Sequence, residues 1–582
     1  MRFSRLVPLA ALLAACAAPS SPPASPPPSH ADAAGRISED TSDDAAVAHA
    51  EQEYLDLVTS IYPEHATELG IHARDTELDD RTLAANAAGL AREEAMLKGL
   101  QARFAQPRAS RAARTDLAVL MHALAVDVRV NRELAPLERQ PDVYTAPMNS
   151  VFLMMARDYA PARERATNAL ARIDKVPAVV AAAKANLKSP PRIWTQVGIE
   201  RARSARAFFA EERGPLLLAL PGEQARIDAS LGAAVAAYDS LADYLEKVVL
   251  PRSDGQFAAG KPLFEFLLHE DYFLKDDVDT VYALGEKIFA RTDQQMTELA
   301  HRIDPQAKGW PEVAARLKAK HPTARGLLEG YRGEVLRARA FLVAHDVVPF
   351  PPDDVLDVID TPQFQRTTIT AAYDAPPPFD KVTKGFFFVT PVDPALPADE
   401  QEQMLRENDW ADIVNTAVHE GYPGHHLQLS FARRHPSLMR KASSPAILEE
   451  GWALYCEELM AELGYYTDEQ RLMQLEWTLV RAARVLIDIG LHTRGMTFEE
   501  GVAMLTDKVH LEKELAVSEV KRYTQSPTQP LSYLVGREMI FRLRDRYKER
   551  EKERFSLKRF HAEVLSRGGI APGLIEEEMF EP

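Results

Sequence analysis

The chain has 582 residues, of which 46% are hydrophobic and 27% are charged, and its formal net charge at pH 7 is −17. A chain of this length and apolar content can bury a large core, so we expect a globular body. The acidic excess repels phosphate groups and therefore excludes nucleic acid as the expected partner. It selects no other partner, and the oligomeric state stays open.

The start of the chain has the features of a bacterial lipoprotein signal. An apolar run over residues 6–15 follows two arginines, and Cys16 comes directly after Leu13-Ala14-Ala15. The run is shorter than the roughly 20 residues that span a bilayer, so residues 1–15 are predicted to be a signal peptide. Cleavage before Cys16 would leave an acylated cysteine that anchors the protein in the cell envelope, facing the periplasm. The alternative is a secreted protein without an anchor.

The segment after the signal is poor in large apolar residues. Residues 16–46 contain mainly alanine, proline, serine and acidic residues, and we expect a disordered tether there. Residues 47–582 are expected to form one helical domain, either as a single body or as a scaffold (47–345) and a metal-bearing lobe (346–582). Since Cys16 lies in the signal region, Cys456 is predicted to be a buried free cysteine.

Most of the first half has the periodicity of helices. From about residue 47 to 342, apolar residues recur every three or four positions, which predicts a scaffold of packed helices. The clearest helical windows are 82–104, 204–213 and 277–302. Breaks are predicted at Pro136, Pro190-Pro191, Pro251 and Pro305.

The pattern changes between Pro349 and Pro397, where prolines are dense and residues 385–390 read as a strand. This strand either pairs with a substrate backbone by β-augmentation or forms a buried hairpin without a ligand. The predicted fold is therefore mainly α, with a small β-sheet before the metal-binding helix. Helices are then expected at 401–421, 446–463, 467–492, 497–505, 511–522, 531–552 and 557–566.

His419 and Glu420 begin a pattern that is typical of a zinc hydrolase. Catalytic zinc takes three protein ligands, often two histidines and a glutamate, and His-Glu-x-x-His places both histidines on one helical face. Here the fourth residue after His419 is Pro423, and the next histidines are His425 and His426. The segment 421–424 must therefore bulge or restart the helix. We prefer His425 as the second ligand, with His426 as the alternative.

A third ligand is expected from the helix that contains Glu449, Glu450 and Gly451-Trp452-Ala453. The stretch from Glu450 to Glu457 resembles the Asn-Glu-Gly-Phe-Ala helix of the aminopeptidase-N-like glutamate zincins. That resemblance assigns Glu450, rather than Glu449, to the metal. Glu457 lies two turns further along and either orients a ligand histidine or is a solvated helix charge.

Over nearly the whole mature chain, the sequence resembles the bacterial domain of unknown function 885 family, many of whose members are predicted lipoproteins. The resemblance implies a zincin-like metallopeptidase fold but no substrate. One departure is Thr528, where the family usually has glycine. The motifs that carry the resemblance are Tyr62-Pro63-Glu64-His65-Ala66-Thr67-Glu68-Leu69-Gly70, His419-Glu420-Gly421-Tyr422-Pro423-Gly424-His425-His426, Glu450-Gly451-Trp452-Ala453, and Arg522-Tyr523 with Pro527, Gln529 and Tyr533.

The expected reaction is hydrolysis with one zinc ion on His419, His425 and Glu450. Zinc lowers the pKa of water and polarises a carbonyl, while Glu420 acts as general base and then general acid. The downstream motif offers Tyr523 or Tyr533 to stabilise the oxyanion. It also offers Arg522 to bind a substrate carboxylate. For each of these three, a packing role is the alternative.

The predicted function is thus an envelope zinc metallopeptidase that acts on short peptides, with the end it trims left open. Two alternatives remain. One is a non-catalytic lipoprotein that keeps the metal for folding or binds a partner, which the presence of Glu420 argues against. The other is a metal hydrolase for an ester or a non-peptide amide.

Overall fold

The structure is a computed structural model that describes residues 42–361, 366 and 370–581. The predicted signal peptide, the lipidation site Cys16 and residues 16–41 of the predicted tether lie outside this range. The first helix begins at Asp44, so the last residues of the predicted tether are helical. Within the described residues, no helix combines the length and the hydropathy needed to cross a membrane.

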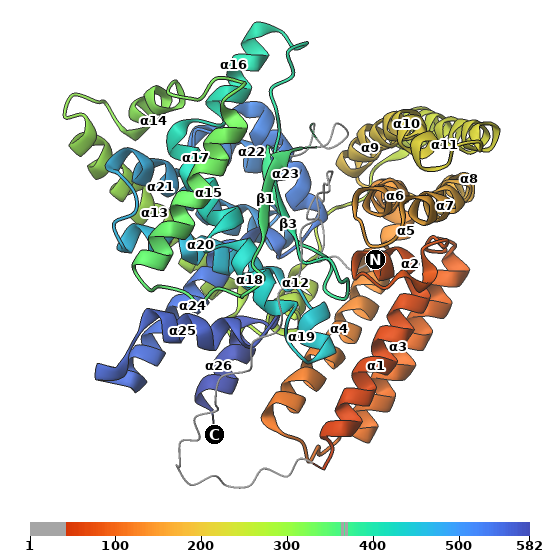
Figure 1. The fold of residues 1–582 in the computed structure, drawn as a ribbon, viewed down its shortest axis with the longest axis horizontal. Helices are drawn as coiled ribbons and strands as arrows, with labels where there is room; N and C mark the ends of the chain where they lie inside the picture. The colour runs from red at the N-terminus through yellow and green to blue at the C-terminus, as the bar shows by residue number, and fades with distance from the viewer. Residues whose placement is uncertain (1–41, 362–365, 367–369, 582) are drawn as a thin grey trace.

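The first part of the chain is helical. Its elements are α1 (Asp44–Ile61), α2 (Pro63–Glu68), η1 (His72–Arg74), α3 (Leu83–Arg103), α4 (Arg111–Leu134), α5 (Pro136–Arg139), η2 (Pro141–Thr145), α6 (Pro147–Ala156), α7 (Ala162–Ile173), α8 (Val176–Asn186), α9 (Arg192–Glu211), α10 (Arg213–Ala219) and α11 (Gln224–Tyr244). In Figure 1, α1, α3 and α4 lie side by side, and α6 to α11 form a second group above them.

The next elements join these groups to the larger body on the left of Figure 1. They are η3 (Leu245–Val249), η4 (Leu250–Arg252), α12 (Lys261–Glu270), α13 (Val278–Ile303), α14 (Trp310–Lys318) and α15 (Leu327–Ala344). The predicted windows 82–104 and 277–302 coincide with α3 and α13 to within one residue at each end, and 204–213 covers the end of α9 and the first residue of α10, so helices are confirmed in all three windows. Thr82 and Asp277 cap the first and last of them by accepting backbone hydrogen bonds.

The second part contains the sheet and the remaining helices. These are β1 (Leu356–Asp360), β2 (Ala371–Asp374), β3 (Gly385–Val389), α16 (Ala398–Arg406), α17 (Trp410–Thr416), η6 (Ala417–Gly421), α18 (His425–Ala432), α19 (Leu438–Ala442), α20 (Ala446–Glu462), α21 (Asp468–Thr493), α22 (Phe498–Asp507), α23 (Lys513–Gln525), α24 (Gln529–Glu551), η7 (Lys552–Arg554), α25 (Leu557–Leu565) and α26 (Pro572–Phe580). The prediction of a mainly helical chain with a small sheet is confirmed.

The single helix predicted over 401–421 is wrong. The chain forms α16, α17 and η6 there, and it leaves the helical conformation between Arg406 and Trp410. Asp409 explains the break, because its side chain accepts hydrogen bonds from the amides of Ala411 and Asp412 and starts a new helix. Periodicity continues across this cap and conceals it.

The predicted strand is present as β3, and of the two roles left open for it, pairing with a substrate backbone is wrong. The strand order is β1-β3-β2, so β3 is the central strand. β1 pairs with it in parallel, starting with Leu356 opposite Gly385, and β2 pairs antiparallel, with Ala371 opposite Val389. Both edges of β3 are occupied, and β-augmentation on this strand is excluded.

The sheet lies between the two parts of the molecule. Successive residues of β3 face opposite sides, so each side of the sheet packs against a different group of helices. Phe387 packs into the core that contains α1, α15, α20 and the C-terminal helices. Phe386 and Phe388 pack against the group formed by α6 to α11. Helices from both halves thus cover the sheet. The two halves also meet where α13 packs along α21.

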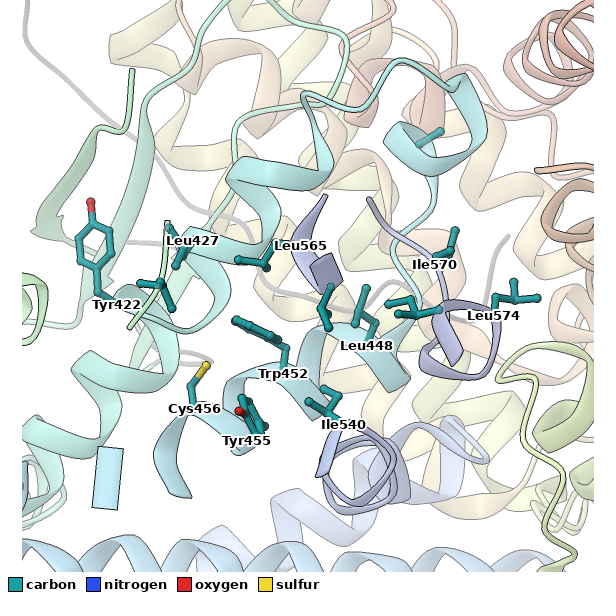
Figure 2. Close-up of a cluster of buried hydrophobic side chains, with 14 of the residues drawn as sticks. Tyr422, Leu427, Leu448, Trp452, Tyr455, Cys456, Ile540, Leu565, Ile570 and Leu574 are labelled. Atoms are coloured by element: carbon teal, nitrogen blue, oxygen red, sulfur yellow. The ribbon is translucent and has the colours of Figure 1, made fainter. Parts of the chain in front are cut away.

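Helix α20 is buried along almost its whole length, and α24, η6, α18 and α21 pack against it. Figure 2 shows Trp452, Tyr455 and Cys456 of α20 in a cluster with Leu427 of α18 and Ile540 of α24. Cys456 is a buried free cysteine, as predicted. This apolar packing fixes the helix that carries Glu450.

Two glycines let α20 and α24 touch. A Cβ added to Gly451 would lie 2.6 Å from Cα of Gly536, and one added to Gly536 would lie 2.0 Å from the carbonyl oxygen of Ile447. Neither neighbour can yield, because both atoms belong to helix backbone. A side chain at either position must push the two helices apart.

Gly451→Ala is expected to lower the free energy of unfolding by roughly 1–3 kcal/mol, because the added methyl overpacks a backbone contact. Gly99→Ala is the matched control, since a Cβ there meets nothing within 4 Å. Because Gly99 lies in the interior of α3, Gly99→Ala is expected to raise the free energy of unfolding by about 0.5–1 kcal/mol. Urea unfolding followed by circular dichroism measures both, and equal effects of the two substitutions would contradict the close contact.

Candidate metal centre

A break in the helix separates the two histidines of the central motif. His419 and Glu420 lie in η6, which is a π-helical turn at the end of α17. Tyr422 then adopts an extended conformation, the Tyr422–Pro423 peptide bond is cis, and α18 begins at His425. The predicted bulge or restart within 421–424 is therefore confirmed.

Gly424 and Trp452 hold this break in place. A Cβ on Gly424 would lie 1.8 Å from the carbonyl oxygen of His419, so only glycine fits. The Gly424 amide donates to the carbonyl of Val418 at 3.1 Å. The indole Nε1 of Trp452 donates to the carbonyl of Pro423 at 2.8 Å. Helix α20 thus fixes the direction in which α18 starts.

Three donor atoms converge between η6, α18 and α20. Nε2 of His419 lies 3.6 Å from Oε2 of Glu450, and Nε2 of His425 lies 3.4 Å from the same oxygen. Ligands about 2.0–2.1 Å from a tetrahedral zinc ion are roughly 3.3–3.5 Å apart, so the spacing and the donor types fit zinc. The side chains of His425 and Glu450 are 13% and 12% exposed, which leaves the cluster reachable from solvent.

Glu420 is also near this cluster. One of its carboxylate oxygens lies within 4.8 Å of a ring nitrogen of both His419 and His425. Glu450 is closer to both rings. In addition, Oε2 of Glu420 accepts a hydrogen bond from the amide of Tyr373 at 2.7 Å. The geometry therefore fits Glu450 as ligand and Glu420 as the carboxylate beside it.

Glu457 orients His419. Its Oε1 accepts a hydrogen bond from Nδ1 of His419 at 2.7 Å, and its side chain is fully buried. The alternative of a solvated helix charge is therefore wrong. With Nδ1 held in this way, Nε2 points to the cluster as a donor atom for a metal.

The charges of the cluster favour a protonated His419 and an ionised Glu450. Burial opposes the charged form of His419, but Glu450, Glu457 and Glu420 outweigh it and raise the pKa of His419 to about 9. Burial likewise opposes ionisation of Glu450, yet His419 and His425 keep its pKa well below the usual value. A metal ion binding here would replace the proton on His419.

His426 faces away from the cluster. Its Nε2 donates to Oδ1 of Asp354 at 2.7 Å, and its Nδ1 lies 3.1 Å from the hydroxyl of Tyr373. Tyr422 also donates to Asp354, through its hydroxyl, at 2.7 Å. Both nitrogens of His426 are thus occupied within the protein, which favours His425 as the ligand.

Strand β2 forms the sheet edge next to Glu420. Tyr373, whose amide holds Glu420, is followed by the buried Asp374. Asp374 pairs with the buried Arg157, which comes directly after α6. The first half of the chain therefore helps to fix the position of the carboxylate that is expected to act as general base.

The downstream candidates separate into two groups. Tyr533 lies beside the cluster, with its ring nearly parallel to that of His419 and the centroids 6.4 Å apart. Burial and the charge of Glu450 raise the pKa of Tyr533, which keeps its hydroxyl protonated. Tyr523 donates instead to Glu519, and Arg522 pairs with Glu519 at 3.1 Å. Of the two tyrosines, Tyr533 is the one whose ring lies beside His419.

Thr528 has a backbone φ of 71°, in the left-handed region that favours glycine. Its amide donates to the buried carboxylate of Asp488 at 3.3 Å. Asp488 therefore holds the left-handed turn at Thr528.

Sequence reasoning missed Tyr373 and Arg481. Tyr373 contributes through its backbone amide, which no side-chain pattern reveals. Arg481 and Arg484 lie in the window predicted as helix over 467–492, within an otherwise apolar run. Two arginines at this spacing among apolar residues were a usable signal, because arginine is rarely fully buried unless it is paired.

A family model covers almost the entire domain. The model of a bacterial protein family of unknown function, DUF885, matches residues 63–579. The chain belongs to the DUF885 family. A search of curated proteins found no match.

Two solved structures share the fold of this DUF885 protein. One is a predicted lipoprotein of unknown function from Shewanella oneidensis, 24% identical, with a TM-score of 0.77, covering 92% of this chain and 100% of that one. The other is a predicted lipoprotein from Colwellia psychrerythraea, 18% identical, with a TM-score of 0.77, covering 92% of this chain and 98% of that one.

His425→Ala is expected to abolish stoichiometric zinc binding, whereas His426→Ala is expected to retain it, because His426 is engaged by Asp354. Metal content after dialysis, measured by mass spectrometry, tests this. Circular dichroism confirms that each variant is folded. Loss of zinc from a folded His426→Ala alone would show that the ligand assignment is wrong.

Glu457→Gln is expected to weaken zinc binding by roughly 10- to 100-fold, because the partner of a ligand histidine loses its charge. Glu462→Gln on the same helix is the control, since Glu462 pairs with Arg544 and is 42% exposed. Competition with a chelator of known affinity measures both. Equal affinities of the two variants would argue against the orienting role.

Proposed function

We propose that this protein is a zinc-dependent metallopeptidase that hydrolyses short peptides. The observation that carries the proposal is the convergence of His419, His425 and Glu450 with donor spacings of 3.4 and 3.6 Å. Glu420 lies beside these donors, which supports a catalytic site rather than a structural one. Structural zinc sites normally close all four positions with protein ligands, whereas here three protein ligands would leave one position open.

Zinc, when bound, supplies Lewis acidity that polarises the scissile carbonyl and lowers the pKa of water. The Tyr373 amide fixes one oxygen of Glu420, so the carboxylate is oriented to accept a proton from the attacking water. As the C–N bond breaks and the new C–O bond remains, Glu420 delivers that proton to the leaving nitrogen. The hydroxyl of Tyr533 donates a hydrogen bond to the oxyanion.

The proposed location is the bacterial cell envelope, with the mature chain anchored through a lipid on Cys16. The arrangement of the first residues supports this proposal, and both related structures are predicted lipoproteins. A short peptide that reaches the protein there would be the substrate. The zincin-like fold is part of the same proposal.

Glu420→Gln is expected to keep about one equivalent of zinc and to lower kcat by roughly 100- to 10,000-fold, because it removes the general base. The assay is a peptide library followed by mass spectrometry, with and without a chelator. Glu402→Gln in α16 is the control, since its carboxylate is 53% exposed. Wild-type protein that binds zinc but cleaves no peptide would refute the proposed activity.

A further inference from the structure

Arg481 on α21 is a buried arginine with two unsatisfied donor atoms. The residue is 8% exposed, and its Nε and Nη1 atoms have no hydrogen-bond partner among the described residues. A guanidinium remains charged when it is buried, so its donors are expensive to leave unsatisfied. Such a group is retained most readily where an anionic ligand pairs with it.

Arg481 lies near the metal centre, because Tyr533 contacts both Arg481 and His419. Its guanidinium carbon lies 4.6 Å from the ring centroid of Trp477 and 5.5 Å from that of Tyr533. Tyr533 is also the tyrosine that lies beside His419. Stacking on aromatic rings leaves the N–H edge of a guanidinium for a planar acceptor such as a carboxylate.

Two arginines near Arg481 share one acid. Arg484 and Arg522 share the single carboxylate of Glu519, at 2.7 and 3.1 Å. The Nη1 atom of Arg484 is also buried without a partner. Arg481 is thus a third guanidinium beside Arg484 and Arg522, which already share the carboxylate of Glu519.

The acids nearest to Arg481 are committed elsewhere. Glu450 and Glu457 act on its charge through space, but both carboxylates contact His419. The acidic side chains Glu450 and Glu457 therefore lie around His419, and arginine side chains lie around Arg481. Tyr533 is next to both His419 and Arg481.

We infer that Arg481 binds a carboxylate of the substrate, with Arg484 assisting through its free Nη1 atom. The inference rests on the proposed peptidase function and adds a substrate class to it. A peptide has two sources of this group, its C-terminal carboxylate and an acidic side chain. Binding the first would make the enzyme trim peptides from the carboxyl end.

The activity test compares three matched peptides: a neutral peptide with a free C-terminal acid, its C-terminal amide, and the amide with one glutamate side chain. Wild-type enzyme is expected to cleave a carboxylate-bearing peptide on the order of 10- to 100-fold faster, in kcat/KM, than the neutral amide. Preference for the free acid identifies the terminal carboxylate as the source. Preference for the glutamate peptide identifies the side chain. Equal rates for all three overturn the inference.

Arg481→Gln is expected to lower the ratio of kcat/KM for the preferred carboxylate-bearing peptide to kcat/KM for the neutral amide by roughly 10- to 100-fold, to about one. Arg481→Lys keeps the positive charge but loses the bidentate donor geometry of the guanidinium. It is expected to keep part of the preference for carboxylate-bearing peptides. Arg302→Gln is the control for net charge, because Arg302 is 66% exposed on α13. A purely structural role would lower the rates for all peptides equally in Arg481→Gln, which would contradict the inference.

A binding experiment separates this inference from the proposed function. Calorimetry with Glu420→Gln protein measures the affinity for the same three peptides without turnover. Tighter binding of a carboxylate-bearing peptide, lost on adding Arg481→Gln, supports the inference even if the wild type cleaves nothing. Equal affinities for all three peptides overturn it, and cleavage by the wild type would then leave the peptidase proposal intact.

Discussion

The contact between Gly451 and Gly536 sets the geometry on which the candidate site depends. Because α20 and α24 meet backbone to backbone, Glu450 and Tyr533 face the same space, each within a turn of the crossing. The glycine after Glu450 is thus a packing requirement. It brings the tyrosine to the carboxylate, while the apolar cluster in Figure 2 prevents α20 from rotating.

Helix α21 connects this crossing to the rest of the site. Gln474 donates to Glu457 at 3.4 Å, and so holds the carboxylate that orients His419. Asp488, further along the helix, accepts from the amides of Thr528 and Leu531 at 3.3 Å and fixes the start of α24. One helix therefore positions the partner of a candidate ligand and the helix of Tyr533, and it also carries Arg481.

Local patterns predicted the parts of this arrangement that local interactions determine. The long helices and the free Cys456 follow from periodicity and composition, and the restart after Gly421 follows from Pro423. The direction of that restart could not be predicted, since Trp452 fixes it from another helix. The central place of β3 was hidden for the same reason: its partner strands are short, and they carry no periodic signal in a proline-rich segment.

The net charge of the chain is negative, but two buried arginines near the candidate site have unpaired donors. This contrast matters for an anionic substrate. The chain carries −17 overall, yet Arg481 and Arg484 keep unpaired donors in the interior. Acidic surface residues are screened over about 8 Å in physiological salt, whereas buried guanidinium groups act across a short, poorly screened distance. A substrate carboxylate would therefore respond to the arginines once it enters the site. In the proposed reaction this attraction would hold one end of the peptide while Glu420 acts on the scissile bond, so binding and chemistry would depend on different helices.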